Sequence, residues 1–436
     1  MMKLSNLQLP IISCPSLWVM IILCCLSTNI SASTQTTLTQ DESSLCERIC
    51  ACVTPKGSRE PMRLYQDKEN PWIQELNLSF RAQYQGAVVK ANQGSYPGSH
   101  DSTSEWRRLR LGWNAKLFNA IKLVNTWNLG GVDGAGYPVN GLWHDHKQTT
   151  GHLFEMFVEY AWDGNKISIG KMRPMMLCEY RQGSSSYIMP ELPALEEQLK
   201  SENAYGIAFS RSEKDKSWDY YGGVWSDTER SYRKAWGTWY SAFTTMGVSK
   251  KADDFILSKG RLYFDWIYNF LEMDEFATQK FNHRDSFVGS RAEHTFALYY
   301  KGSSGPFELN VEIIEACHLA SYKQKKDIVT PDNALGLIFT PMYMLTDHLQ
   351  AVFRYQCTTG DDAVALAKRY VNLVPTEGSY INDYQAIALG FNFYVYPENH
   401  KRMKIMLMAE YTNSHRNDLT KGMTGWTYIG GMYLDF

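Results

Sequence analysis

The chain has 436 residues, a formal net charge of −2 and an aromatic content of 14%. This balance lacks the basic excess of nucleic-acid-binding proteins, so no nucleic-acid partner is expected. The mean hydropathy is −0.36, and beyond the N-terminal region no apolar run reaches the roughly 20 residues of a membrane-spanning helix. A bundle of spanning helices is therefore excluded.

Residues 1–33 show the three consecutive regions of a secretory signal peptide. Lys3 precedes a mostly apolar segment at 9–26, and small residues follow at 31–33, as in exported precursors. An uncleaved anchor is the alternative. A lipid anchor at Cys24 or Cys25 is disfavoured, because Leu23 rather than a small residue precedes the pair.

Residues 34–71 are read as a polar lead-in without clear periodicity. They contain Cys46, Cys50 and Cys52, which lack the paired CxxC spacing of a zinc site. In an exported protein a local disulfide among them fits, and thiols without a specific role fit equally well. The sequence leaves their role open.

From residue 72 onward, short segments alternate apolar and polar residues, the two-residue period of a strand with one wet face. In the first segment Leu76, Leu78 and Phe80 alternate with Asn77 and Ser79. Sixteen strands are predicted, at 73–85, 105–118, 120–130, 153–162, 166–173, 203–210, 217–225, 235–249, 259–270, 291–300, 306–317, 333–343, 348–357, 383–396, 402–412 and 426–436. A short helix is predicted at 193–199.

The links between these strands alternate in length. Short links fall near 119, 163–165, 302–305, 345–347 and 397–401, and long polar stretches lie at 86–104, 131–152, 174–202, 271–290, 318–332, 358–382 and 413–425. Such alternation is typical of outer-membrane barrels, with short periplasmic turns and long extracellular loops. A soluble β-sandwich does not require it.

These patterns predict an all-β fold, a sixteen-stranded antiparallel transmembrane β-barrel over 72–436. A strand in hydrocarbon cannot leave backbone groups unpaired, so the sheet has to close. Its apolar face then meets lipid and its polar face a lumen. The alternative is a soluble exported all-β binding protein.

The last strand runs to the C-terminal Phe436 and has to pair with the first strand to close the barrel. A terminal aromatic strand also resembles the signal that the insertion machinery of bacterial outer-membrane proteins reads. We therefore expect this machinery to be a partner of the chain.

Three stretches resemble the phosphate-selective porin O and P family. They are A-L-G-F-N-F-Y-V-Y-P-E-N-H-K-R-M-K-I-M-L-M-A-E-Y-T at 388–412, I-S-I-G-K-M-R-P-M at 167–175, and L-T-D-H-L-Q-A-V-F-R-Y at 345–355 with Asp361 after it. The resemblance implies a passive water-filled channel in the bacterial outer membrane, a homotrimer, passing small hydrophilic solutes. In some members of the family the solutes are anions such as phosphate.

The alternation puts several basic side chains on the predicted lumen face, namely Arg81, Arg108, Arg110, Lys116, Lys122, Lys166, Arg354 and Lys404. Rings of Arg and Lys in a pore favour anions. Five acidic residues, Glu155, Glu159, Glu308, Glu312 and Glu410, share that face. A mixed wall supports general solute passage as readily as anion selection.

The third long loop, after the fifth predicted strand, is the expected constriction, since porins of this architecture fold that loop into the lumen. It carries Arg181, Ser184, Ser185 and Ser186, whose hydroxyl and guanidinium groups suit an oxyanion. Glu179 and Glu191 in the same loop count against an anion site.

No catalytic site, cofactor or metal is expected. Residues 143–146, W-H-D-H, bring two His and an Asp together, but without further ligands at fixed spacing a polar loop is favoured over a metal site. No nucleophile elbow or phosphate loop occurs. An outer-membrane enzyme built on a barrel remains the second alternative.

Overall fold

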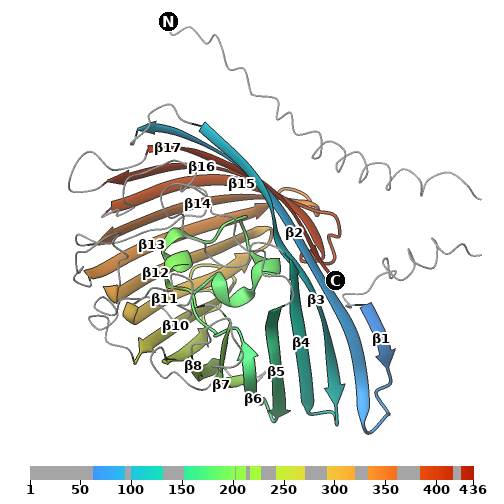
Figure 1. The fold of residues 1–436 in the computed structure, drawn as a ribbon. Helices are drawn as coiled ribbons and strands as arrows, with labels where there is room; N and C mark the ends of the chain where they lie inside the picture. The colour runs from blue at the N-terminus through green and yellow to red at the C-terminus, as the bar shows by residue number, and fades with distance from the viewer. Residues whose placement is uncertain are drawn as a thin grey trace, which may run out of the picture. The chain divides into compact units, whose positions relative to one another are not determined.

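The fold is that of a computed structural model (Figure 1). It describes residues 62–93, 100–130, 152–201, 203–212, 217–226, 242–270, 292–319, 332–360, 383–415 and 424–436. The chain divides into two units, Met1–Ser58 and Arg59–Phe436, and all described residues belong to the second. The predicted signal peptide, Cys46, Cys50, Cys52 and the W-H-D-H stretch lie outside the described residues.

Within the described ranges, sixteen antiparallel strands form one closed barrel. Each strand pairs with the next along the chain, and the last pairs with the first. The strands are β2 (Ile73–Gln93), β3 (His100–Leu117), β4 (Ile121–Gly130), β5 (His152–Trp162), β6 (Asn165–Met172), β7 (Ala204–Ser212), β8 (Trp218–Ser226), β9 (Phe243–Lys251), β10 (Lys259–Asn269), β11 (Ala292–Ser304), β12 (Phe307–Leu319), β13 (Asp332–Met344), β14 (Leu349–Gly360), β15 (Asp383–Tyr394), β16 (Met403–His415) and β17 (Thr424–Asp435).

The predicted barrel is confirmed, and each predicted strand corresponds to one of these sixteen. The main differences are that β9 starts at Phe243 rather than at 235, and that β2 continues to Gln93 rather than to 85. The inward side chains of that extension, Ala87 and Val89, pack on Met189 inside the barrel. Because these inward side chains are apolar and the outward Lys90 is polar and exposed, the alternation of the first part of the strand does not continue.

The outer face of the barrel is apolar. On β15 exposed and buried residues alternate without exception, and the exposed ones include Ile387, Leu389, Phe391 and Phe393. The buried residues between them, such as Asn392, point inward. A closed barrel with an apolar exterior suits the hydrocarbon of a bilayer and does not fit the soluble alternative.

An additional strand, β1 (Met62–Gln66), lies in the segment that the sequence analysis assigned to the lead-in. It pairs with β2 at residues 75–78, next to the point where β17 stops. The backbone of the terminal Phe436 exchanges hydrogen bonds with Phe80, 2.8 and 2.9 Å long. β1 thus pairs with the part of β2 that lies beyond the end of β17. Its residues are mostly exposed, so they show no alternation of apolar and polar side chains from which the strand could be predicted.

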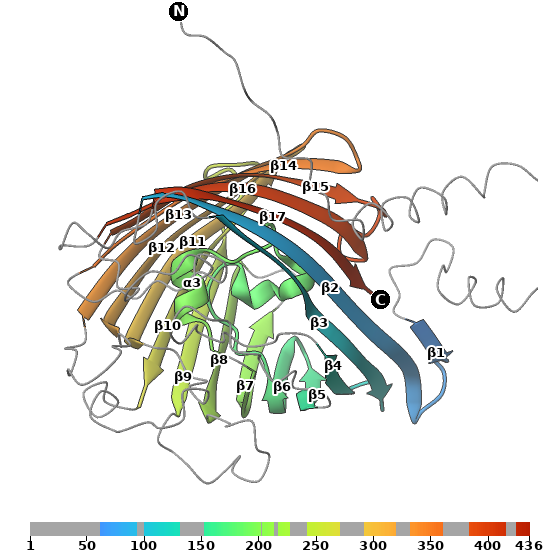
Figure 2. The same ribbon diagram turned by 45° about the horizontal axis from the view of Figure 1, so that its top comes forward.

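The connection between β6 and β7 folds into the barrel interior (Figures 1 and 2). We call residues 173–201 the lumen loop. It contains two 3-10 turns, η1 (Tyr180–Gln182) and η2 (Ser184–Ser186), and the helix α3 (Ala194–Leu199), which confirms the helix predicted at 193–199. In the described part of the chain, no helix is long and apolar enough to cross a membrane.

Candidate functional site

The lumen loop is attached to β10 through Arg181. Its Nη2 atom donates to both carboxylate oxygens of Asp265, at 2.9 and 3.0 Å. The guanidinium also lies over three tyrosine rings, 4.4 to 5.3 Å from their centroids, those of Tyr221, Tyr263 and Tyr299. Because the Arg181 side chain is only 13% exposed and is paired, its contacts serve to hold the loop against the wall.

A second attachment joins the loop to β14. The guanidinium of Arg354 pairs with Glu179, and the two side chains are only 1% and 3% exposed. Arg354 Nη1 also donates to the carbonyl of Glu191 at 2.8 Å. Burial raises the pKa of Glu179, although the charge of Arg354 opposes that shift.

On the opposite side of the loop, η2 contacts β2. Arg81 Nη1 and Nη2 lie 3.3 and 3.5 Å from the hydroxyls of Ser184 and Ser185, and Nη2 lies 2.9 Å from Asp435 Oδ2. Gly183, at φ 82°, makes the turn that leads into η2, and a Cβ there would meet Arg173 Nη1 at 2.8 Å. Three residues predicted as solute contacts, Arg81, Ser184 and Ser185, are thus brought together.

Two further predicted residues, Arg108 and Arg110, are buried on the inner wall of β3. Arg108 Nη1 donates to Gln83 Oε1 at 2.6 Å. Arg110 Nε donates to Asn128 Oδ1 at 2.8 Å, and its guanidinium lies 3.3 Å from the ring centroid of Phe154. The basic wall predicted from β3 is therefore engaged with neighbouring side chains.

The predicted lysines divide into two groups. Lys116 and Lys122 are opposite each other on β3 and β4, and Lys166 on β6 lies 3.4 Å from Glu159; all three are exposed. Lys404 on β16 is instead buried and donates to the carbonyl of Tyr187 in the lumen loop.

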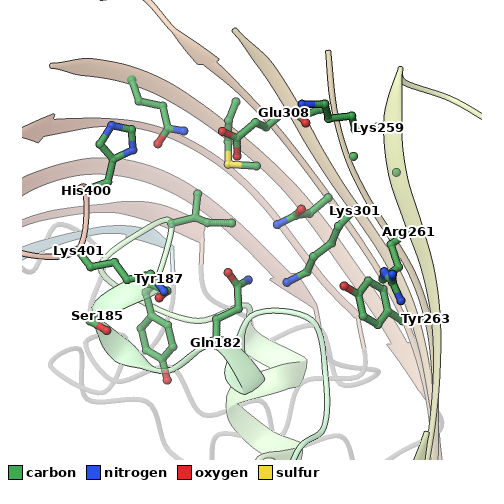
Figure 3. Close-up of a pocket in the computed structure, with 18 of the residues that line it drawn as sticks. Gln182, Ser185, Tyr187, Lys259, Arg261, Tyr263, Lys301, Glu308, His400 and Lys401 are labelled. Atoms are coloured by element: carbon green, nitrogen blue, oxygen red, sulfur yellow. The ribbon is translucent and has the colours of Figure 1, made fainter. Parts of the chain in front are cut away.

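Between the lumen loop and the wall formed by β9 to β16 lies a cavity of about 730 Å³ (Figure 3). Predicted residues Ser185, Ser186 and Lys404 line it. Its lining holds two acidic residues, Asp253 and Glu308, and six basic ones, Lys251, Lys259, Arg261, Lys301, Lys401 and Lys404. This imbalance gives the cavity a net positive charge.

Most of these basic residues were missed by the sequence analysis. Three of them, Lys251, Lys259 and Lys401, lie at strand ends or in a turn. There the alternation of apolar and polar residues does not indicate which side of the sheet a side chain faces. Arg261 alternates with the outward Leu262 along its strand, so the strand pattern indicates that Arg261 faces inward. Their gathering depends on strand register, which the sequence does not display.

Within the ranges that the structure describes, no three His, Cys, Asp or Glu side chains gather in an arrangement able to hold a metal ion.

No protein-family model and no curated protein matches this sequence. Among solved structures, OmpF of Salmonella typhi in complex with daunomycin has a TM-score of 0.54 at 11% identity, covering 86% of this chain and 100% of its own. The outer membrane channel DcaP of Acinetobacter baumannii has a TM-score of 0.50 at 11% identity, with the same coverages. The anion-selective porin from Comamonas acidovorans has a TM-score of 0.50 at 10% identity, covering 83% and 99%. At these identities the likeness shows the fold, which is that of outer-membrane porins.

Proposed function

We propose that the chain is a passive porin of the bacterial outer membrane, a water-filled channel for small hydrophilic solutes with a preference for anions. The porin fold and the apolar exterior support contact with outer-membrane lipid. The observation that carries the anion preference is the cavity lining, with six basic against two acidic residues. Positive charge in a pore raises the local concentration of anions and offsets part of their dehydration cost.

Phosphate is the anion that we propose first. The resemblance to the phosphate-selective porin O and P family supports it, and so do the hydroxyls of Ser185 and Ser186, which line the cavity together with Arg261. Hydroxyl and guanidinium donors bind oxyanions by charge-assisted hydrogen bonds. We further propose that the chain forms a homotrimer in which the short turns face the periplasm and the long loops face the exterior.

The test is conductance of the purified barrel in planar bilayers under a salt gradient. We expect the current to rise in steps as single channels insert. We also expect a reversal potential whose sign corresponds to a preference for anions. A reversal potential of zero, or one of the opposite sign, would exclude the anion preference. An absence of steps would exclude the channel.

A variant pair connects the selectivity to the cavity. Replacing exposed Lys259 and Lys401 by Gln removes two of the six positive charges, so the reversal potential moves toward zero. The control replaces Lys122 and Lys166, exposed lysines that do not line the cavity. We expect a smaller change in the control, because Debye screening at about 0.1 M salt limits charge effects to about 10 Å.

A further inference from the structure

Three basic side chains form a row across β9, β10 and β11 on one wall of the cavity. Arg261 lies in register with Lys251 on one side and with Lys301 on the other, and Lys259 lies two residues further toward the turn. Like charges opposite each other on neighbouring strands are destabilising. The row is therefore a surface that an anionic group would stabilise.

This row is only partly neutralised by protein groups. Arg261 pairs with Asp219, and Lys251 lies 3.4 Å from Asp253 with both side chains exposed. Lys301 donates to the carbonyl of Cys178 at 2.7 Å. Among the residues that the structure describes, Lys259 and Lys301 form no ion pair.

The second wall comes from the turn between β15 and β16, where His400 and Lys401 lie across the open space from Lys301 and Arg261 (Figure 3). The imidazole of His400 stacks on Tyr394, with the centroids 4.0 Å apart and an interplanar angle of 12°. His400 is exposed and lines the cavity, so its ring is accessible to a solute there. Lys401, next to it, has no ion-pair partner in the described part of the chain.

The first wall also presents an aromatic ring beside its charges. Tyr263 follows Arg261 on the same face of β10 and stacks on Tyr299, with the centroids 4.6 Å apart and an angle of 7°. Each wall thus combines a rigidly backed ring with cationic groups. Amide and hydroxyl groups complete the lining, those of Gln182, Ser185, Asn310 and Gln350.

A simple inorganic anion uses the charges of such a site but not its rings. The volume of about 730 Å³ falls in the range of pockets for small organic molecules, about 300–1,000 Å³. Aromatic rings offer an apolar face with specific stacking geometry, and the neutral side chains suit hydroxyl groups. The lining therefore matches a solute that carries an anionic group on a hydroxylated ring.

We propose that this cavity is a binding subsite for phosphorylated sugars. The phosphate lies on the row formed by Lys251, Arg261 and Lys301, with Lys259 beside it on β10, and the sugar ring lies against the His400 face. This proposal rests on the proposed channel function, since it names the solute class that the same cavity takes. It adds a requirement for a ring that a preference for inorganic anions does not have.

Three probes separate the components of this site: glucose 6-phosphate has both ring and phosphate, glucose has the ring alone, and inorganic phosphate has the anion alone. Each is titrated against the potassium chloride current of single channels. We expect glucose 6-phosphate to interrupt the current at concentrations about tenfold lower than either other probe, which corresponds to about 1.4 kcal/mol. Equal block by inorganic phosphate, equal block by glucose, or no block in an open channel would each overturn the subsite.

Variants test the assignment of each wall. Lys259→Gln should weaken block by glucose 6-phosphate several-fold and leave the weak effect of glucose unchanged, whereas His400→Ala should weaken block by both sugars. The matched control is Lys250→Gln, an exposed lysine of β9 that lies in register with outward Leu262 and outside the cavity, with block as in the parent chain. Block unchanged by both cavity variants would overturn the assignment.

A calorimetric titration of the full barrel in detergent makes the test independent of conduction. Binding of glucose 6-phosphate at equilibrium, weakened several-fold in the Lys259→Gln variant, supports the subsite even if no current is seen. A conducting channel without calorimetric binding overturns the subsite and leaves the channel function standing. An absence of current overturns the channel function alone.

Discussion

Arg354 and Glu179 are joined inside the barrel although 175 positions separate them in the chain. A buried ion pair gains little net stability over apolar residues, because both charges lose hydration, but breaking it leaves one charge uncompensated. The pair therefore specifies where the lumen loop lies. Arg181 and Asp265 make a second such pair on β10.

Replacing Arg354 by Met should release this part of the loop. The buried carboxylate of Glu179 loses its partner, and such losses cost about 3–5 kcal/mol. Cys178, the neighbouring residue, is buried, and burial raises the pKa of its thiol, so it should react slowly with maleimides in the parent chain. Faster labelling of Cys178, in a chain whose other cysteines are Ser, is the measurement.

The control for this experiment is the double variant Glu179→Gln with Arg354→Met. It removes both charges, so labelling of Cys178 should return toward the slow parent rate. Equal labelling rates in the parent and in Arg354→Met would show that the pair does not hold the loop.

His400 makes the charge of the cavity depend on pH. Partial burial lowers the pKa of the otherwise exposed His400, and Glu308 offsets part of that shift. The imidazole is therefore neutral at pH 7 and gains its proton only below its ordinary pKa of about 6.5. Acidification adds a positive charge beside Lys401 and Lys404.

We therefore expect anion preference, read from the reversal potential, to increase between pH 7 and about 5, since free His has a pKa of about 6.5. His400→Gln should remove most of this increase. Glu308 also lines the cavity, and Glu308→Gln, which removes a negative charge, should raise the preference already at pH 7. An unchanged pH profile in His400→Gln would exclude His400 as the titrating group.

At the scale of elements, β1 has a defined place in the barrel. β17 covers β2 only from Arg81 to Gln93, and its terminal Phe436 pairs with Phe80. β1 covers the following stretch, Glu75 to Leu78. Without it, this length of β2 would present unpaired backbone groups at the seam where the barrel closes.

Removal of β1 should lower the stability of the barrel. Losing a few backbone hydrogen bonds, each with a net contribution of about 0.5–1.5 kcal/mol, should cost about 2 kcal/mol. The measurement compares denaturant midpoints after deletion of 34–66 and after deletion of 34–58. Only the first deletion removes the strand, so equal midpoints would show that β1 does not stabilise the barrel.

At the scale of the whole molecule, closure of the barrel depends on the last strand. β17 pairs with β16 on one side and with β2 on the other, and the ring of Phe436 lies 5.3 Å from the guanidinium of Arg402. The C-terminal residue thus completes the seam at which the first and last strands meet.

Deleting Phe436 should reduce the yield of barrel assembled in membranes, measured by the shift in gel mobility between unheated and heated samples. The control is Leu298→Ala on β11, an exposed residue of the outer face on a strand that does not pair with β17. An equal yield from the deletion and the control would contradict an assembly role for the terminal residue.

The sequence by itself determined the sixteen strands, the helix of the lumen loop and the two faces of the wall. Alternation is a local property, and burial in lipid imposes it along strands such as β15. It failed where inward side chains are apolar, at Ala87 and Val89, and where a strand is exposed, as in β1. The inward positions of Arg81 and Arg354 followed from the same pattern.

Only the tertiary structure decided what those residues contact. Arg181 and Arg354 are engaged by the lumen loop and the wall, whereas the cavity takes its charge largely from residues such as Lys259 and Lys401. Strand register brings Arg261 between Lys251 and Lys301. Register and loop position depend on contacts between distant parts of the chain, and no local pattern of hydrophobicity records them.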